Sequence, residues 1–150
     1  MNLTLATPED FNSIKEMVVE FANKYPFSVN ISDTKINSLI HDFVYADTRE
    51  KILILANDPE PIGLIAGLKQ EILFSDNKLA SELMWWVNPS HRTTKAGSEL
   101  LEAFEFWAVK VGCSMIQMST VQTEHAERLD KVYNRKGYTL VERGYLKEIK

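Results

Sequence analysis

The stretch Val87–Leu101, VNPSHRTTKAGSELL, decides the fold assignment because it joins two segments of different texture. The apolar residues before it, Ala80–Val87, predict a buried strand. The residues after it, Glu99–Val111, repeat their apolar side chains at helical spacing and predict a helix. A strand that turns directly into a helix leaves the first helical amides without partners, and the helix dipole adds partial positive charge there. The sequence therefore indicates an anion-binding turn.

Four residues in this turn strengthen that interpretation. Arg92 and Lys95 supply positive charge, Gly97 lets a ligand approach the backbone, and Ser98 is a suitable N-cap for the helix. Every strand-to-helix turn has free amides, so an ordinary connection remains the alternative. The sequence lacks the glycine patterns of nucleoside-triphosphate loops and of dinucleotide-binding folds. These two classes of phosphate-binding site are therefore not expected.

Composition and charge exclude several classes of protein. A chain of 150 residues with 45% hydrophobic content predicts one globular domain, residues 1–150. A net charge of −4 argues against a nucleic-acid binder, although the chain from Arg128 onward has seven basic side chains against three acidic ones, which suits a small anionic ligand. The N-terminal residues lack a basic segment followed by an apolar run. We therefore expect a cytoplasmic protein without a membrane segment.

Metal chemistry is not expected either. Cys113 is the only cysteine, and the three histidines have no ligand spacing. Cys113 is interpreted as a small buried apolar residue rather than a nucleophile.

Periodicity predicts the order β-α-α-β-β-β-α-β-α-β-β. A strand over 2–6 precedes a helix that Thr7 caps and that ends near Lys24, and a second helix begins at Ser32–Asp33. The other predicted elements are strands over 51–56, 62–68, 80–87 and 115–120, helices over 99–111 and 126–136, and two short final strands over 139–141 and 145–149.

Three features together resemble the GNAT N-acetyltransferases. Arg92–Gly97 resembles the Arg-x-x-Gly-x-Gly pyrophosphate loop of that family, and Val87-Asn-Pro89 resembles its lead-in. Tyr133, four residues before Gly137-Tyr138, resembles the family's helix-ending pattern, and the element order is the GNAT order. More narrowly, segments such as Phe104–Ala108 look like a group of GNAT-like proteins common in phage and bacterial genomes.

The resemblance implies an α/β (α+β) fold and a function. We expect a mixed, mostly antiparallel sheet of six to seven strands, flanked by about four helices, in which the strands ending at Val87 and starting at Met115 splay apart. It implies acetyl-CoA as cosubstrate and direct attack by a primary amine, with the two first helices and the loop over 71–79 bordering the acceptor. The residues assigned to the coenzyme are Trp86, Val87, Arg92, Thr93, Thr94, Lys95, Ala96, Gly97 and Ser98.

Two side chains are candidates for proton transfer. Glu82 is an acid within an apolar strand and by alternation shares a face with Met84 and Trp86, so it is the candidate base; an ion pair or a solvated strand edge is the alternative. The resemblance assigns Tyr133 to the leaving CoA sulfur, and core packing is its alternative. The strand over 115–120 has no carboxylate that could replace Glu82.

Lys95 stands where the family usually has its first loop glycine. If the backbone there is right-handed, the Lys95 ammonium adds to the phosphate site. If it is left-handed, a residue other than glycine costs about 1–2 kcal/mol there. Lys95 would then indicate that coenzyme binding has been lost. The alternative function is a non-catalytic binding protein, phage-encoded and acting on a host protein. GNAT relatives often dimerise, so a homodimer is also an expectation.

Overall fold

A sheet of five strands organises residues 1–119, the larger of two compact units into which the chain divides. The structure is a computed structural model that describes residues 1–150. Neighbouring strands follow chain order and pair antiparallel, except that the last two pair in parallel. The strands are β1 (Asn2–Leu5), β2 (Lys51–Asn57), β3 (Pro61–Ile72), β4 (Ser75–Val87) and β5 (Met115–Gln117).

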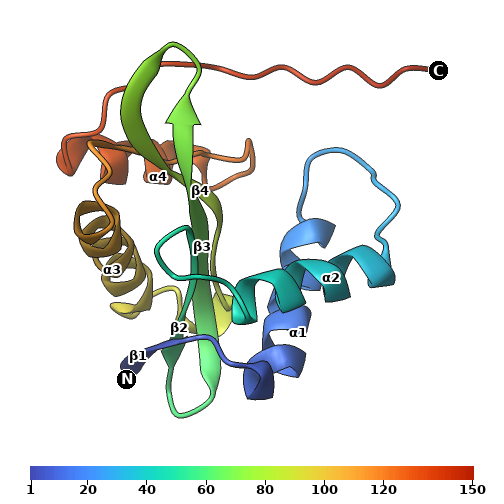
Figure 1. The fold of residues 1–150 in the computed structure, drawn as a ribbon. Helices are drawn as coiled ribbons and strands as arrows, with labels where there is room; N and C mark the ends of the chain where they lie inside the picture. Colours follow the sequence, from blue (N-terminus) through green and yellow to red (C-terminus); the bar gives the residue numbers. More distant parts are fainter. The chain divides into compact units, whose positions relative to one another are not determined.

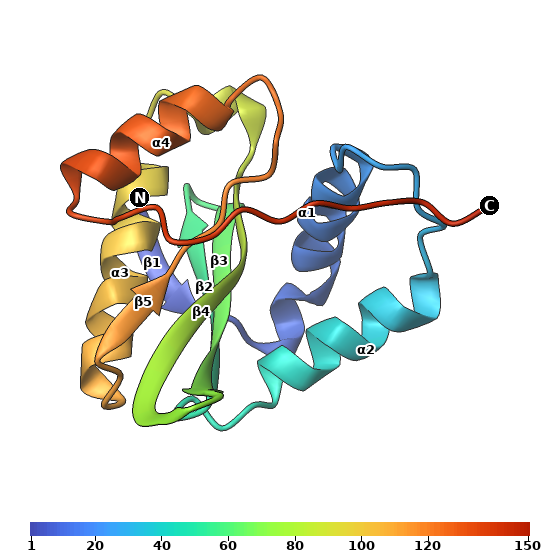
Figure 2. The same ribbon diagram turned by 90° about the horizontal axis from the view of Figure 1, so that it is seen from above.

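Helices cover both faces of this sheet. Figures 1 and 2 show α1 (Phe11–Asn23) and α2 (Asp33–Val44) on one face and α3 (Ala96–Lys110) on the other. Each face has its own core because successive strand residues point to opposite sides: Leu53 and Leu55 pack with the first two helices, whereas Ile52 and Ile54 pack with α3. None of the helices is both long and apolar enough to cross a lipid bilayer.

The expected first helix is divided in two. A 3-10 helix over Pro8–Asp10 precedes α1, and the Asp10 carboxylate accepts hydrogen bonds from the Thr7 amide at 2.8 Å and the Thr7 hydroxyl at 3.1 Å. The second helix begins as predicted, since the Ser32 hydroxyl accepts from the Lys35 amide at 3.2 Å. An ion pair between Lys15 and Asp33, 2.5 Å long, joins α1 to α2.

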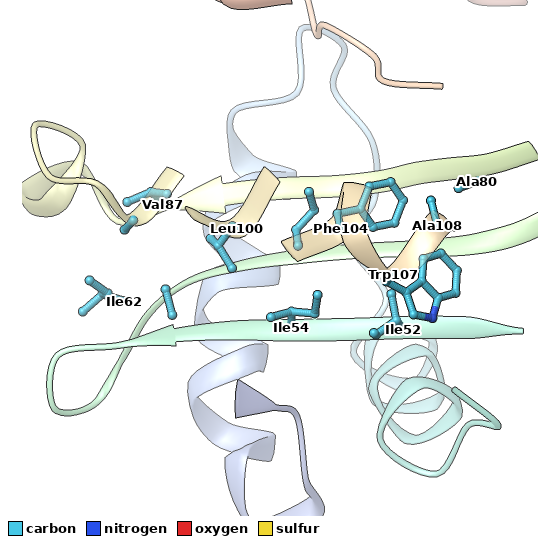
Figure 3. Close-up of a cluster of buried hydrophobic side chains, with 12 residues drawn as sticks. Ile52, Ile54, Ile62, Ala80, Val87, Leu100, Phe104, Trp107 and Ala108 are labelled. Carbon is cyan, nitrogen blue, oxygen red and sulfur yellow. The ribbon is translucent and has the colours of Figure 1, made fainter. Parts of the chain in front are cut away.

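Gly67 sets how closely α3 approaches the sheet. A Cβ atom on Gly67 would lie 2.5 Å from Cζ of Phe104, closer still to Cε2 of the same ring, and 2.6 Å from the Ser81 carbonyl oxygen. Phe104 is fully buried, and Figure 3 shows it gathered with Leu100 and Trp107 of α3 over the strands. The absence of a side chain at Gly67 therefore allows α3 to pack close to the sheet. The Arg92–Ser98 loop is at the N-terminus of this helix.

The β3–β4 hairpin is longer than predicted. Periodicity limited its strands to 62–68 and 80–87, but the strands extend to Ile72 and begin again at Ser75. The prediction of a loop over 71–79 is therefore wrong, because most of these residues belong to the two strands. The turn between the strands exposes Leu73 at 98% and Phe74 at 89%.

Residues 120–150 form the second unit, in which α4 (Ala126–Arg135) is the only regular element. The final strands predicted over 139–141 and 145–149 do not form, so the sheet has five strands rather than six to seven. The side chains there are largely exposed, for example Val141 at 83% and Ile149 at 93%. A strand needs a partner that accepts its backbone hydrogen bonds, and no strand of the sheet pairs with these residues.

Candidate active site

An opening between β4 and β5 is the central feature of the site. The two strands pair at only three positions, the last of which joins Ser81 to Gln117. β4 continues for six residues, from Glu82 to Val87, with no strand on that side. The expected splayed pair is therefore present. β5 therefore does not pair with the edge of β4 that leads from Glu82 to the Arg92–Ser98 loop.

Glu82 lies where the two strands part. Its carboxylate accepts a hydrogen bond from the Ser119 amide across the opening, at 3.3 Å. Burial raises the pKa of the Glu82 carboxyl to about 7, and the Ser119 hydrogen bond, which favours the charged form, lowers it by a smaller amount. The side chain is partly buried. A carboxyl group with this pKa exchanges protons near neutral pH.

A β-bulge at Leu83 overturns the alternation argument for Glu82. Met84 pairs with Ala66 and Glu82 pairs with Gly67, so Leu83 is an extra residue with no partner on β3. Directly paired residues project to the same face, and Gly67 faces Phe104 of α3. Glu82 therefore faces the α3 side, opposite to Met84 and Trp86, which pack on the side of α1 and α2. The bulge and the Ser119 amide are the two features of the site that the sequence did not indicate.

The pairing of β4 with β3 also determines which way the backbone N–H and C=O groups of β4 point near Val87. The Asn88 amide donates to the Ile62 carbonyl at 2.8 Å. Hydrogen-bonded pairs alternate with non-bonded pairs in an antiparallel ladder, so Trp86 bonds toward β3, whereas Trp85 and Val87 direct their N–H and C=O groups toward the opening. The two tryptophan side chains lie on opposite faces, as predicted.

Arg92 fastens the loop to the end of β4. Its Nε donates to the Val87 carbonyl at 2.8 Å, and its guanidinium carbon lies 4.5 Å from the centre of the Trp86 ring. The Trp86 Nε1 donates to the Asn88 side-chain oxygen at 3.1 Å. The first cation of the predicted phosphate loop thus also positions it, through a hydrogen bond and a cation–π contact.

Helix α3 begins three residues earlier than predicted. Ala96 is its first residue and Lys95 its N-cap, so Ser98 lies within the first turn and does not cap it; its hydroxyl donates to the Lys95 carbonyl at 3.0 Å. The Thr94 hydroxyl accepts from the Ala96 amide at 3.2 Å. The next two amides, those of Gly97 and Ser98, have no hydrogen-bond acceptor in the chain. These amides are the ones that a helix N-terminus offers to an anion.

The conformation of Lys95 resolves the question that its sequence position raised. Its φ of −78° and ψ of −4° are right-handed, and no residue other than glycine has a positive φ in the chain. The left-handed penalty therefore does not apply. Lys95 and Thr93 are exposed beside the free amides. Gly97 is open as well: a Cβ atom there would meet Trp85 and Val87 only at ordinary contact distances of 3.7 and 3.8 Å.

Tyr133 belongs to the second unit, near the end of α4. It is 9% exposed, and its ring lies 5.5 Å from that of Tyr138. The Tyr138 amide donates to the Tyr133 carbonyl at 3.0 Å, and Gly137, with a φ of 88°, provides the left-handed residue that ends the helix. The Tyr-x-x-x-Gly-Tyr pattern thus has a structural role in closing α4.

The other candidates do not form a reactive site. Cys113 packs against the α3-side core, and burial raises the pKa of its thiol, which agrees with the apolar role predicted for it. The structure brings together no cluster of three histidine, cysteine or carboxylate side chains that could hold a metal ion.

Comparison with known proteins decides the family. The model of the Acetyltransferase (GNAT) family matches residues 14–138. This chain is a GNAT protein. The match covers both the opening of the sheet and the segment that contains Tyr133. A search among curated protein sequences finds no significant match.

Solved structures with the GNAT fold resemble the chain over almost its whole length. An aminoglycoside N-acetyltransferase, AAC(6')-Iy, in complex with a CoA bisubstrate analogue is 15% identical, with a TM-score of 0.75 and coverage of 99% of this chain and 97% of that one. A ribosomal-protein-alanine N-acetyltransferase from Brucella melitensis biovar Abortus 2308 is 13% identical, with a TM-score of 0.75 and coverage of 99% and 100%. A transcriptional regulator from Bacillus halodurans C-125 is 16% identical, with a TM-score of 0.78 and coverage of 99% of both chains. At these identities the likeness concerns the fold.

Proposed function

We propose that the protein is an N-acetyltransferase that transfers the acetyl group of acetyl-CoA to a primary amine by direct attack. The amine nitrogen bonds to the thioester carbonyl carbon, the carbon–sulfur bond breaks, and the proton lost by the amine ends on the CoA thiol. The observation that carries the proposal is that β5 stops pairing with β4 at Ser81, so that the rest of β4 leads from Glu82 to a loop with two free helix amides. AAC(6')-Iy, which has the same fold, was crystallised with CoA.

The loop is proposed to bind the pyrophosphate of the coenzyme. The Gly97 and Ser98 amides and the exposed Lys95 ammonium would hold the anion, with Thr93 beside them. The Thr94 hydroxyl and the Arg92 guanidinium keep the loop in shape through the bonds that they make within the chain. Ala96 is fully buried and anchors the first turn to the core, so its contribution to the phosphate site is its backbone position.

The part of β4 beyond its pairing with β5 is proposed to bind an extended pantetheine chain. The peptide-like groups of pantetheine would continue the sheet along Trp85 to Val87, because β5 does not pair there. The Val87 carbonyl already accepts from Arg92, so the Val87 amide is the group proposed to bind pantetheine at that residue. Trp86 would contribute through the position of its indole rather than through its backbone.

Glu82 is proposed to accept the proton of the acceptor amine. A lysine-like amine with a pKa of about 10.4 is almost fully protonated at neutral pH and must lose a proton before it attacks. A carboxyl group with a pKa of about 7 is well matched to that transfer. Because Glu82 faces the α3 side, a water molecule in the opening would relay the proton.

Tyr133 is proposed to hydrogen-bond the departing CoA sulfur. A phenol with an ordinary pKa near 10 and a thiol near 8.5 differ by about 1.5 units, so complete proton transfer costs roughly 2 kcal/mol. That cost is small beside the barrier of an uncatalysed acyl transfer. The role follows from the match of Tyr133-x-x-x-Gly137-Tyr138 to the GNAT pattern.

Thiol release from acetyl-CoA in the presence of a panel of amines tests this function. Tyr133→Phe should lower kcat about 100-fold, the smaller end of the effect of a proton donor, without changing the affinity for acetyl-CoA. Tyr145→Phe, at a residue that is 91% exposed, is the matched control. Equal turnover by Tyr133→Phe and wild type would show that Tyr133 only packs.

The non-catalytic alternative loses the ground that Lys95 gave it, because the backbone at Lys95 is right-handed. A homodimer stays a proposal that rests on the family resemblance and on the exposed apolar residues of 139–150, such as Leu140 and Tyr145. Sedimentation equilibrium of the full chain, compared with a chain that ends at Tyr138, tests it. A monomer at every concentration would refute it.

A further inference from the structure

An apolar cavity lies between the first two helices and the sheet. Its volume is about 40 Å³, and all ten lining side chains are hydrocarbon or thioether groups. They come from α1, α2 and the middle three strands, and include Val18, Leu39, Leu83 and Met84. A single water molecule needs about 10–15 Å³ and two to four polar partners. The cavity is therefore large enough for about three or four carbon atoms but offers no polar side chain to water.

This cavity lies on the α1 and α2 face of the sheet and reaches β4 at Leu83, the sequence neighbour of Glu82. Leu83 is the bulged residue next to Glu82, and it lies two residues past Ser81, the last residue of β4 that pairs with β5. Leu83 is 48% exposed and Leu39 is 40% exposed, so the two side chains form walls that reach solvent. At about 3.3 Å per strand residue, the entrance lies roughly 7 Å along β4 from the point where the strands part.

The surface near the same helices is also apolar. The loop that joins α1 and α2 exposes Tyr25, Phe27, Val29 and Ile31 at alternate positions. Figures 1 and 2 show this loop on the same side of the sheet as α1 and α2. The exposed apolar side chains of this loop add to the apolar surface on the side of the sheet that contains the cavity.

We propose that the acceptor has a hydrocarbon group of about three or four carbons next to its primary amine, and that this group occupies the cavity at Leu83. The proposal rests on the proposed acetyltransferase function and specifies its acceptor. An amine that reaches the opening between β4 and β5 from this side places its substituent against Leu83 and Met84. Hydroxyl or ammonium groups in that position would lose their hydration without gaining a partner, which is costly.

A series of unbranched alkylamines tests this acceptor class. Their amines have a basicity close to that of lysine, so differences in rate reflect the hydrocarbon chain. From ethylamine to pentylamine, kcat/KM should rise about fourfold for each methylene until the cavity is filled, the value expected from about 0.8 kcal/mol per buried methylene. Leucinamide and a peptide with N-terminal leucine should exceed their serine counterparts. If leucinamide reacts faster than the leucine peptide, the acceptor is a small-molecule amine; if the peptide reacts faster, the acceptor is a protein N-terminus.

A cavity-filling variant separates this effect from a general one. Val18→Phe, on α1 and away from Glu82, should reduce the ratio of kcat/KM for butylamine over ethylamine about tenfold or more and leave acetyl-CoA affinity unchanged. Val109→Phe on α3, at a residue that is 74% exposed, is the matched control. If Val18→Phe does not fold, methyl NMR of the wild-type protein replaces it: butylamine, but not ethylamine, should shift the methyl signals of Val18 and Leu83.

The outcomes distinguish this inference from the function on which it rests. CoA release at the same rate with every alkylamine, or fastest release with an aminoglycoside, would overturn the acceptor class and leave the acetyltransferase function standing. No CoA release with any amine, together with no binding of acetyl-CoA, would overturn both.

Discussion

Replacing Glu82 with glutamine should stabilise the protein in a way that depends on pH. The carboxyl group has a pKa of about 7 in the folded chain, against 4.5 for an ordinary glutamate, because burial disfavours its charged form. Below pH 4.5 the group is protonated in both states and burial costs little. As the pH rises from 4.5 to 7, the unfolded chain ionises first, so the free energy of unfolding of the wild type falls.

The size of this effect follows from the two pKa values. A difference of about 2.5 units at 1.36 kcal/mol per unit gives roughly 3 kcal/mol, and this is an upper value because the side chain is partly exposed. Urea unfolding at pH 4.5, 6 and 8 measures it. The advantage of Glu82→Gln over wild type should grow by up to about 3 kcal/mol between pH 4.5 and 8.

Glu102→Gln, at an exposed residue of α3, is the matched control. If the difference between Glu82→Gln and wild type is the same at pH 4.5 and pH 8, within about 0.5 kcal/mol, Glu82 is not desolvated. The argument that it is a base adjusted to neutral pH would then fail.

Three further predictions follow from the same geometry. Gly97→Ala should leave the free energy of unfolding unchanged or raise it by about 0.4–1 kcal/mol. It should weaken acetyl-CoA binding about tenfold or more, since the loss of one charge-assisted hydrogen bond costs roughly 1.5 kcal/mol. Thermal unfolding measures the first effect and calorimetric titration the second. Gly67→Ala should destabilise the chain by about 1–3 kcal/mol through overpacking against Phe104, measured by urea unfolding, and an unchanged midpoint would contradict the close approach of α3. The log of kcat/KM for an alkylamine should rise with a slope of about one below pH 7 and level off above it, because ionised Glu82 takes the proton of the protonated amine, whereas Glu82→Gln should keep a slope of about one up to the pKa of the amine.

The sequence was most informative where residue type alone determines the structure. The anion site inferred from Arg92 and Gly97 stays a prediction, and the right-handed backbone of Lys95 is compatible with it. The start of α3 was misjudged because Ser98 is a good N-cap residue by type. The helix begins earlier since the Thr94 hydroxyl satisfies the Ala96 amide, an arrangement that depends on the path of the whole loop.

Other features escaped prediction because they depend on contacts between distant residues. The bulge at Leu83 arises from the register between β3 and β4, and one extra residue reversed the face assigned to Glu82. The Ser119 amide reaches Glu82 across 37 residues of sequence. The apolar residues over 139–141 have strand propensity, but propensity does not supply a pairing partner.

Binding of acetyl-CoA tests the central claim most directly, because the loop, the part of β4 that β5 does not pair with and the family all concern the coenzyme. Isothermal titration of the full chain with acetyl-CoA and with CoA measures it. We predict one site per chain with a dissociation constant well below about 1 mM for both, within the usual range of enzyme substrates, and weaker binding by Gly97→Ala. A dissociation constant no better than millimolar for both ligands would contradict the account.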